Sequence, residues 1–200
     1  PIMQINISSV DFDIGGTWIR VYLLQGTRVL RTVRKRTPTT SAKELRAALA
    51  RLYVRIAAGL TVRAIHVGVA GSVRGVRILS SANVPALKQF DFKGLFPTSV
   101  PLTVENDARA FLRRALRRHP KLRQGVVLGI TLGTGVGRAV ASNGRVRVIQ
   151  QLEHHEPWEG QYQRSRFQAS NRLAKLVAQR LQCLIERYKP QVVALGGGVV

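Results

Sequence analysis

The chain has 200 residues, and its hydrophobic content of 45% is enough for a packed core, which excludes a disordered protein. No apolar run reaches the roughly 20 residues of a membrane-spanning helix, and residues 1–4 lack the basic and apolar regions of a signal peptide. The only cysteine, Cys183, excludes an intramolecular disulfide and fits a reducing compartment. The sequence therefore predicts a soluble, cytoplasmic protein of one or two domains, without a membrane partner.

The net charge of +22, with an isoelectric point near 11.8, raises nucleic acid as a partner. The basic residues are mostly arginines scattered over every segment, with no lysine tract or tail. This pattern favours a solvated arginine-rich surface, and polyanion binding stays open as the alternative. Seven of the ten acidic residues gather in three compact groups: Asp11 with Asp13, Glu105 with Asp107, and Glu153 with Glu156 and Glu159.

Hydrophobic spacing predicts strands and helices along the whole chain. An antiparallel meander is expected first, over residues 5–12, 17–24 and 28–36. Helices are expected over residues 42–58, 106–118 and 171–188. The other strands are expected over residues 61–70, 74–79, 100–104, 126–132, 138–142, 145–149 and 190–195. Each half begins with strands that turn on glycines, which predicts an internal pseudo-repeat with a boundary near residues 102–105.

Two local patterns define where elements begin and turn. Ser41 and Glu44 form a capping box at the start of the first expected helix. Asn143-Gly144 is the favoured residue pair for a two-residue hairpin turn.

The first candidate motif is Asp13-Ile14-Gly15-Gly16-Thr17, between the first two expected strands. A Gly-Gly pair can make a tight turn whose bare backbone lies against a phosphate. The acid before it can hold a hydrated metal ion, and the threonine can donate to a phosphate oxygen. A simple hairpin is the alternative interpretation.

A second glycine turn, Gly133-Thr134-Gly135-Val136-Gly137, follows a long apolar strand. It is not a dinucleotide fingerprint, because Arg138 stands where that pattern needs glycine and a hairpin follows in place of a helix. No glycine loop continues into the Gly-Lys-Ser/Thr of a P-loop. A second phosphate-binding turn is the interpretation that matches the first motif, and a plain hairpin bend is the alternative.

Two further motifs lie at strand ends. Glu105-Asn106-Asp107 enters a helix, where the helix dipole keeps Asp107 ionised and able to take a proton from a substrate hydroxyl. The alternative for these residues is an N-cap. Gly196-Gly197-Gly198 permits close approach of a flat ligand or a phosphate, and a flexible loop is the alternative.

Together the four motifs resemble the ROK family, which comprises sugar kinases and related repressors of the sugar kinase/Hsp70/actin superfamily. The resemblance implies an α/β fold of two ribonuclease-H-like domains with mixed sheets, over residues 1–104 and 105–200, closing on a cleft. The C-terminal domain would be shortened, because the chain stops at Val200 just past the last glycine motif. A fragment, a minimal form and a degenerate member all stay open.

The resemblance also implies roles for single residues. Asp13 would hold Mg²⁺ through water, and Asp107 would be the base that activates the sugar hydroxyl. The phosphates of ATP would be bound by Gly15, Gly16, Thr17, Gly133 and Thr134, and its adenosine by Gly196 and Gly197. The sugar would be bound by Asn83, Asn106, Asp107 and His154.

The sequence departs from the family pattern in its glutamate-x-glycine-histidine sugar motif. Gln151-Leu152-Glu153-His154 is its nearest equivalent, and a shifted alignment would use Glu153 or His155 instead. The cysteine-rich zinc loop of the family is missing, so no structural zinc is expected. No helix-turn-helix precedes the first strand, which argues against the repressor branch.

The resemblance implies ATP-dependent phosphorylation of a hexose hydroxyl, as in a glucokinase, with ATP and Mg²⁺ as cofactors. A third interpretation is another kinase of the superfamily, such as an N-acetylated hexosamine kinase. The alternative is a non-catalytic member that binds a sugar or a nucleotide and associates with nucleic acid. A homodimer also stays open.

Overall fold

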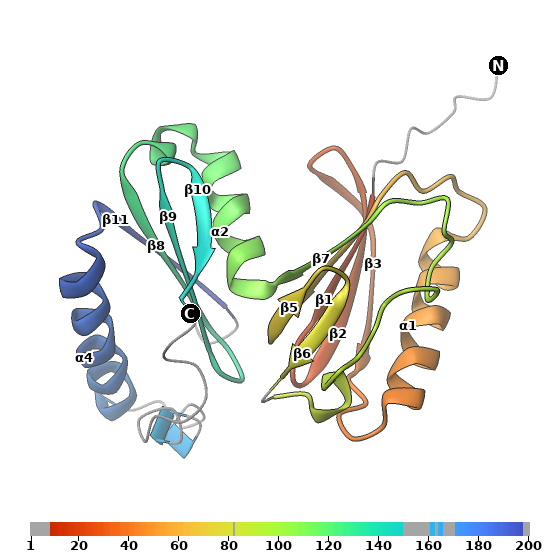
Figure 1. Ribbon diagram of the computed structural model, residues 1–200, viewed down its shortest axis with the longest axis horizontal. Coiled ribbons are helices and arrows are strands. Elements are labelled where there is room, and N and C mark those ends of the chain that lie inside the picture. The colour runs from red at the N-terminus through yellow and green to blue at the C-terminus, as the bar shows by residue number, and fades with distance from the viewer. Residues whose placement is uncertain (1–8, 82, 150–160, 163, 166–170, 198–200) are drawn as a thin grey trace. The chain divides into compact units, whose positions relative to one another are not determined.

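The computed structural model describes residues 9–81, 83–149, 161–162, 164–165 and 171–197 (Figure 1). The chain divides into two compact units, Pro1–Asp107 and Ala108–Val200. This division falls just beyond the boundary expected between residues 104 and 105. Among the described residues, no helix combines the length and the apolar character needed to cross a membrane.

Unit 1 is built on a five-stranded mixed sheet with the order β3-β2-β1-β4-β7. Its strands are β1 (Ser9–Ile14), β2 (Trp18–Gln25), β3 (Arg28–Arg36), β4 (Ile65–Val69) and β7 (Leu102–Asn106). The first three form the predicted antiparallel meander, while β1, β4 and β7 are parallel neighbours. The strand predicted over residues 61–70 corresponds to β4 and is shorter than expected, because its pairing with β1 begins only at Ile65.

One face of this sheet is covered by α1 (Ala42–Ala57). Alternate side chains of β1 and β2 are buried against the helix residues Leu45, Leu49, Leu52 and Ile56. Figure 1 shows α1 running alongside the sheet. The side chain of Ser41 accepts a hydrogen bond from the backbone N–H of Glu44 at 3.2 Å, as the capping box predicts.

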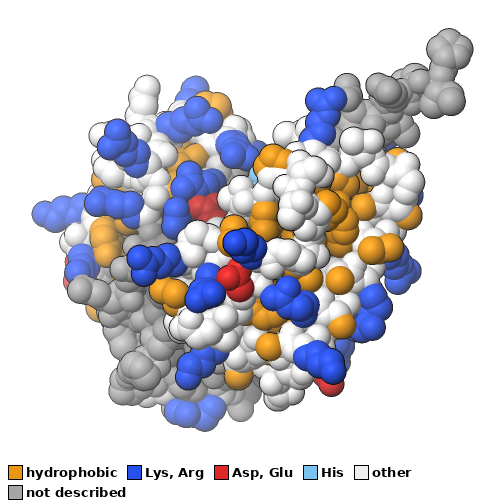
Figure 2. Space-filling view, turned by 45° about the vertical axis from the view of Figure 1, so that its right-hand side comes forward, with side chains coloured by type: hydrophobic (Ala, Val, Ile, Leu, Met, Phe, Trp, Pro, Cys, Tyr) orange, Lys and Arg blue, Asp and Glu red, His pale blue; other side chains and the backbone are white. Residues whose placement is uncertain are grey.

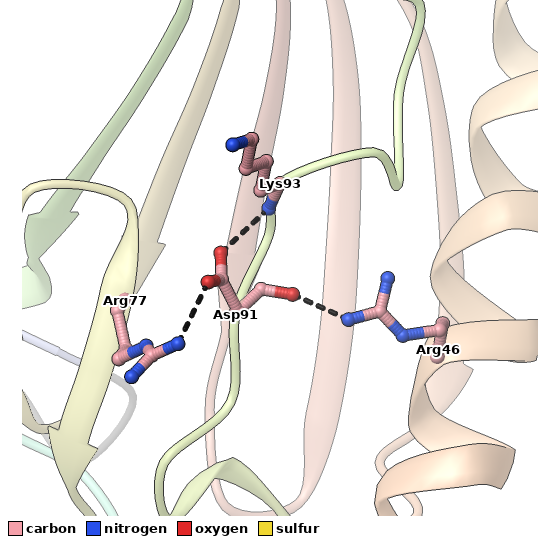
Figure 3. A network of polar contacts seen from close by, with 4 residues as sticks. All are labelled: Arg46, Arg77, Asp91 and Lys93. Carbon is pink, nitrogen blue, oxygen red and sulfur yellow. Dashed lines mark hydrogen bonds and ion pairs between the residues drawn. The ribbon is translucent and has the colours of Figure 1, made fainter.

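The connection from β4 to β7 differs from the sequence prediction. A single strand over residues 74–79 is wrong, because Gly75 adopts a φ of +60° and turns the chain into a hairpin. Its strands are β5 (Ser72–Arg74) and β6 (Arg77–Ser80), and η1 (Pro85–Leu87) follows them. In the loop after η1, Asp91 accepts three hydrogen bonds (Figure 3). The donors are Arg46 of α1, Arg77 of β6 and the backbone N–H of Lys93.

Unit 2 has a four-stranded sheet with the order β10-β9-β8-β11. The strands are β8 (Val126–Leu132), β9 (Val136–Ser142), β10 (Arg145–Val148) and β11 (Val192–Gly196), and only β8 and β11 are parallel. The predicted turn at Asn143-Gly144 joins β9 to β10, and both residues have positive φ angles of 48° and 76°, as a two-residue hairpin turn requires.

Helices cover both faces of this second sheet. Side chains that alternate along β8 pack on one face against α2 (Asp107–Arg118) and on the other against α4 (Asn171–Tyr188). Gly129 permits the close approach of α2, because a Cβ there would lie 3.1 Å from the Leu112 side chain. The short η2 (Pro120–Arg123) connects α2 to β8.

Candidate active site

The carboxyl ends of three parallel strands form one edge of the unit 1 sheet. The register aligns Asp13 of β1 with Gly68 of β4, and Gly68 with Glu105 of β7. The Gly15–Thr17 turn follows β1, and Asp107 follows β7 as the first residue of α2. Ligands bind at this kind of edge in open α/β sheets. Unit 1 thus brings the first glycine motif and the Asn106-Asp107 pair to one edge.

The first glycine turn is held by a residue that the sequence analysis did not single out. The backbone N–H of Gly15 donates to the Trp18 carbonyl at 3.0 Å and closes the turn. The Thr37 hydroxyl donates to the Gly15 carbonyl at 2.8 Å, and the Thr37 N–H donates to the Thr17 carbonyl at 3.1 Å. The only sequence signal was that Thr37-Pro38 ends the strand beside this turn.

Asp13 is half-exposed and forms an ion pair with Arg20, with 3.2 Å between Arg20 Nη1 and Asp13 Oδ2. Burial raises the pKa of the Asp13 carboxyl above its ordinary value, while the hydrogen bond and charge of Arg20 oppose this rise. Across the described ranges, no group of three or more His, Cys, Asp or Glu side chains could hold a metal ion. One carboxylate fits Mg²⁺, which keeps several waters and binds through substrate phosphates.

Asn106 and the loop that carries Asn83 are attached to the same turn after β4. Asn106 is buried, and its Nδ2 donates to the Gly71 carbonyl at 3.1 Å. The Ser81 hydroxyl donates to the Ala70 carbonyl at 2.6 Å and accepts from the Val84 N–H at 3.3 Å, which anchors the loop that carries half-buried Asn83. These bonds give both segments a common support in unit 1.

Asp107 is half-buried and begins α2. At this position the positive end of the helix dipole stabilises an ionised carboxylate. An ionised carboxylate at a ligand-binding edge can accept a proton from a hydroxyl group.

The two glycine motifs of unit 2 are also neighbours. Gly133 and Thr134 follow β8, and Gly196 ends the parallel strand β11 opposite Thr131. Gly197 has a φ of +116°, and a Cβ on it would lie 2.1 Å from the carbonyl oxygen of Leu132, the residue just before the second glycine turn. A Cβ on Gly133 would meet nothing within 4 Å. The turn therefore has open space on that side.

Buried Tyr162 supports the second turn, because its hydroxyl donates to the Gly133 carbonyl at 3.0 Å. Its hydrogen-bond partner lies 29 residues away in the chain. His154, with its alternatives Glu153 and His155, lies outside the described residues.

The sequence profile of the ROK family matches residues 9–151. The chain belongs to this family. Membership confirms the prediction from the four motifs, and the structural neighbours confirm the α/β, actin-like fold with mixed sheets. No curated protein matches the chain.

Three solved structures illustrate the range of this ROK fold. The inorganic polyphosphate/ATP-glucomannokinase from Arthrobacter sp. strain KM is 26% identical, with a TM-score of 0.80 over 95% of this chain and 83% of the other. The ROK glucokinase from Streptomyces griseus, solved with glucose and AMPPNP, is 22% identical, with a TM-score of 0.81 over 97% and 84%. A ROK transcriptional regulator, homologous to the E. coli MLC protein, is 17% identical, with a TM-score of 0.67 over 95% and 65%.

Proposed function

We propose that this ROK protein transfers the terminal phosphoryl group of ATP to a hydroxyl of a hexose, with glucose as the first candidate. The observation that carries the proposal is the placement of Asp107 at the same sheet edge as the Gly15–Thr17 turn. A base and a phosphate-binding turn at one edge are what phosphoryl transfer to an alcohol needs.

In the proposed reaction, Asp107 accepts the proton of the sugar hydroxyl as that oxygen attacks the terminal phosphorus. The bond from phosphorus to the bridging oxygen breaks, and ADP leaves with the electron pair. Such a base typically contributes ~10²–10⁴-fold to the rate. The other sugar contacts are assigned to Asn83, Asn106 and His154.

The proposal assigns the ATP phosphates to the two glycine turns. The phosphate-binding residues are Gly15, Gly16, Thr17, Gly133 and Thr134, and the adenosine-binding residues are Gly196 and Gly197. Asp13 would hold Mg²⁺ through water. When bound, this ion supplies the charge neutralisation that phosphoryl transfer requires.

The direct test is sugar-dependent release of ADP by the purified chain, with the sugar phosphate identified by mass spectrometry. The sugar panel contains glucose, mannose, N-acetylglucosamine and N-acetylmannosamine. Because the glucomannokinase neighbour is named for two donors, inorganic polyphosphate is tested beside ATP. We expect ADP release with glucose or mannose, and ADP release that no sugar increases would contradict the proposal.

A second candidate is a non-catalytic ROK member that binds a sugar or nucleotide and associates with nucleic acid. The exposed basic surface of β3 favours this candidate. The strand lies at one edge of the unit 1 sheet, and every one of its residues except Val33 is exposed. The basic residues of this strand are Arg28, Arg31, Arg34, Lys35 and Arg36. Figure 2 shows Lys and Arg side chains spread over the visible face, with few acidic side chains among them. ATP binding without phosphoryl transfer would support this candidate.

A further inference from the structure

Thr37, the first residue after β3, forms hydrogen bonds with both ends of the first glycine turn, Gly15–Thr17, which is the proposed phosphate turn. Its hydroxyl reaches the Gly15 carbonyl at 2.8 Å, and its backbone N–H reaches the Thr17 carbonyl at 3.1 Å. Threonine is β-branched, so its χ1 angle is restricted and its hydroxyl is held in one direction. A single side chain and its own backbone thus orient two carbonyl groups of a three-residue turn.

The orientation of these carbonyls determines which groups of the turn can meet an anion. All described peptide bonds are trans, and in a trans peptide the C=O and the following N–H point in opposite directions. Because the Gly15 carbonyl is directed at Thr37, the N–H of Gly16 is directed to the other side. Phosphate is bound by backbone N–H groups and repelled by carbonyl oxygens.

The same short segment also contacts the loop that carries Asn83. The Thr39 carbonyl accepts a hydrogen bond from the backbone N–H of Ala86 at 2.8 Å. Ala86 is buried in η1, three residues after Asn83. Between the two threonines, Pro38 fixes its own φ and limits the motion of the segment. Residues 37–39 therefore connect the phosphate turn to the proposed sugar loop.

We propose that Thr37 is a positioning residue for the donor phosphates, and that it acts by directing the Gly16 N–H toward them. The inference rests on the proposed function, since it requires a phosphate donor at this turn. It adds a residue outside all four motifs and a support that extends to the sugar loop.

The test compares the wild type with Thr37→Val, which keeps the β-branched shape and the backbone N–H and removes the hydroxyl. Calorimetry gives the affinities for ATP with Mg²⁺, for adenosine and for glucose. We expect Thr37→Val to weaken ATP binding about three- to tenfold, the range that one neutral hydrogen bond is worth. Adenosine and glucose affinities should stay unchanged, since neither ligand carries a phosphate.

Two controls separate positioning from general damage. Thr37→Ser keeps the hydroxyl and should bind ATP within about twofold of the wild type. Thr32→Val makes the same atomic change at an exposed position on β3 and should leave all three affinities unchanged. Independently of any variant, the Gly16 amide signal of ¹⁵N-labelled wild type should shift with ATP and Mg²⁺ and stay in place with adenosine.

Each contrary outcome has a distinct meaning. Wild-type ATP affinity in Thr37→Val, an equal loss of adenosine affinity, or an unmoved Gly16 amide would overturn the positioning role and leave the proposed kinase function standing. Failure of the wild type to bind ATP at all would overturn both the proposed function and the role of Thr37.

Discussion

At the residue scale, Asp91 joins three parts of unit 1 (Figure 3). Its carboxylate accepts from the Lys93 backbone N–H at 2.8 Å and from Arg77 of β6 at 3.2 Å, while its carbonyl accepts from Arg46 of α1. The Lys93 hydrogen bond, with a smaller contribution from Arg77, lowers the pKa of the Asp91 carboxyl below its ordinary value. The ionised form is therefore favoured in the folded state.

A lowered folded-state pKa makes the contribution of Asp91 depend on pH. The stabilisation is present above the ordinary pKa of 3.8 and is lost as pH falls through the lower folded-state value. We expect Asp91→Asn to lower the melting temperature at pH 6 and to lose this difference in more acidic solution. Thermal unfolding of both proteins across this range tests it, and a difference independent of pH would contradict the assigned role.

The supporting residues of the two turns illustrate what sequence reasoning could not find. Thr37 reaches Gly15 across 22 positions, and Tyr162 reaches Gly133 across 29. Neither residue type nor local spacing indicates such a partner, because the pairing depends on how the strands are registered in space. The glycines of the motifs could be found from the sequence, because a residue without a Cβ allows a ligand or another segment to approach the backbone closely.

At the element scale, Gly197 and Gly133, which follow β11 and β8, differ in whether the structure has room for a side chain. Gly197→Ala would place a Cβ 2.1 Å from the Leu132 carbonyl oxygen at a φ of +116°. We expect it to destabilise unit 2 by more than about 1 kcal/mol. Gly133→Ala introduces a methyl group into open space, so it should leave stability unchanged and weaken ATP binding.

Chemical denaturation and ATP calorimetry on both variants separate these effects. Equal stability of the two alanine variants would contradict the geometry at Gly197. Normal ATP affinity in Gly133→Ala would remove this turn from the proposed phosphate site.

Most elements could be predicted because their local signals agree with their packing. The predicted ranges 28–36, 126–132 and 171–188 match β3, β8 and α4. The hairpin at Gly75 was missed, since one glycine in a short segment of mixed polar and apolar residues does not by itself show that the chain reverses direction. Parallel pairing of β1 with β4 joins strands separated by a helix, and no local pattern encodes it.

At the scale of the whole molecule, the charge of +22 is the property that the kinase proposal does not use. In the alternative of polyanion binding, this surface would bind DNA without sequence preference, through phosphate contacts that release counterions. We predict that DNA affinity falls roughly 10³–10⁵-fold between 50 and 200 mM salt if about six to ten phosphates are contacted. Fluorescence anisotropy with two unrelated DNA sequences tests this, and a flat response to salt would contradict polyanion binding.

The central claim is that Asp107 takes the proton of a sugar hydroxyl during phosphoryl transfer from ATP. The decisive measurement is the kcat of sugar-dependent ADP release by the wild type, Asp107→Asn and Asp91→Asn. Asp91→Asn makes the same chemical change at a half-buried carboxylate of unit 1 that lies outside the proposed site. We predict a fall in kcat of ~10²–10⁴-fold for Asp107→Asn alone, with the affinity for ATP retained. Wild-type turnover in Asp107→Asn, or an equal loss in both variants, would contradict the account.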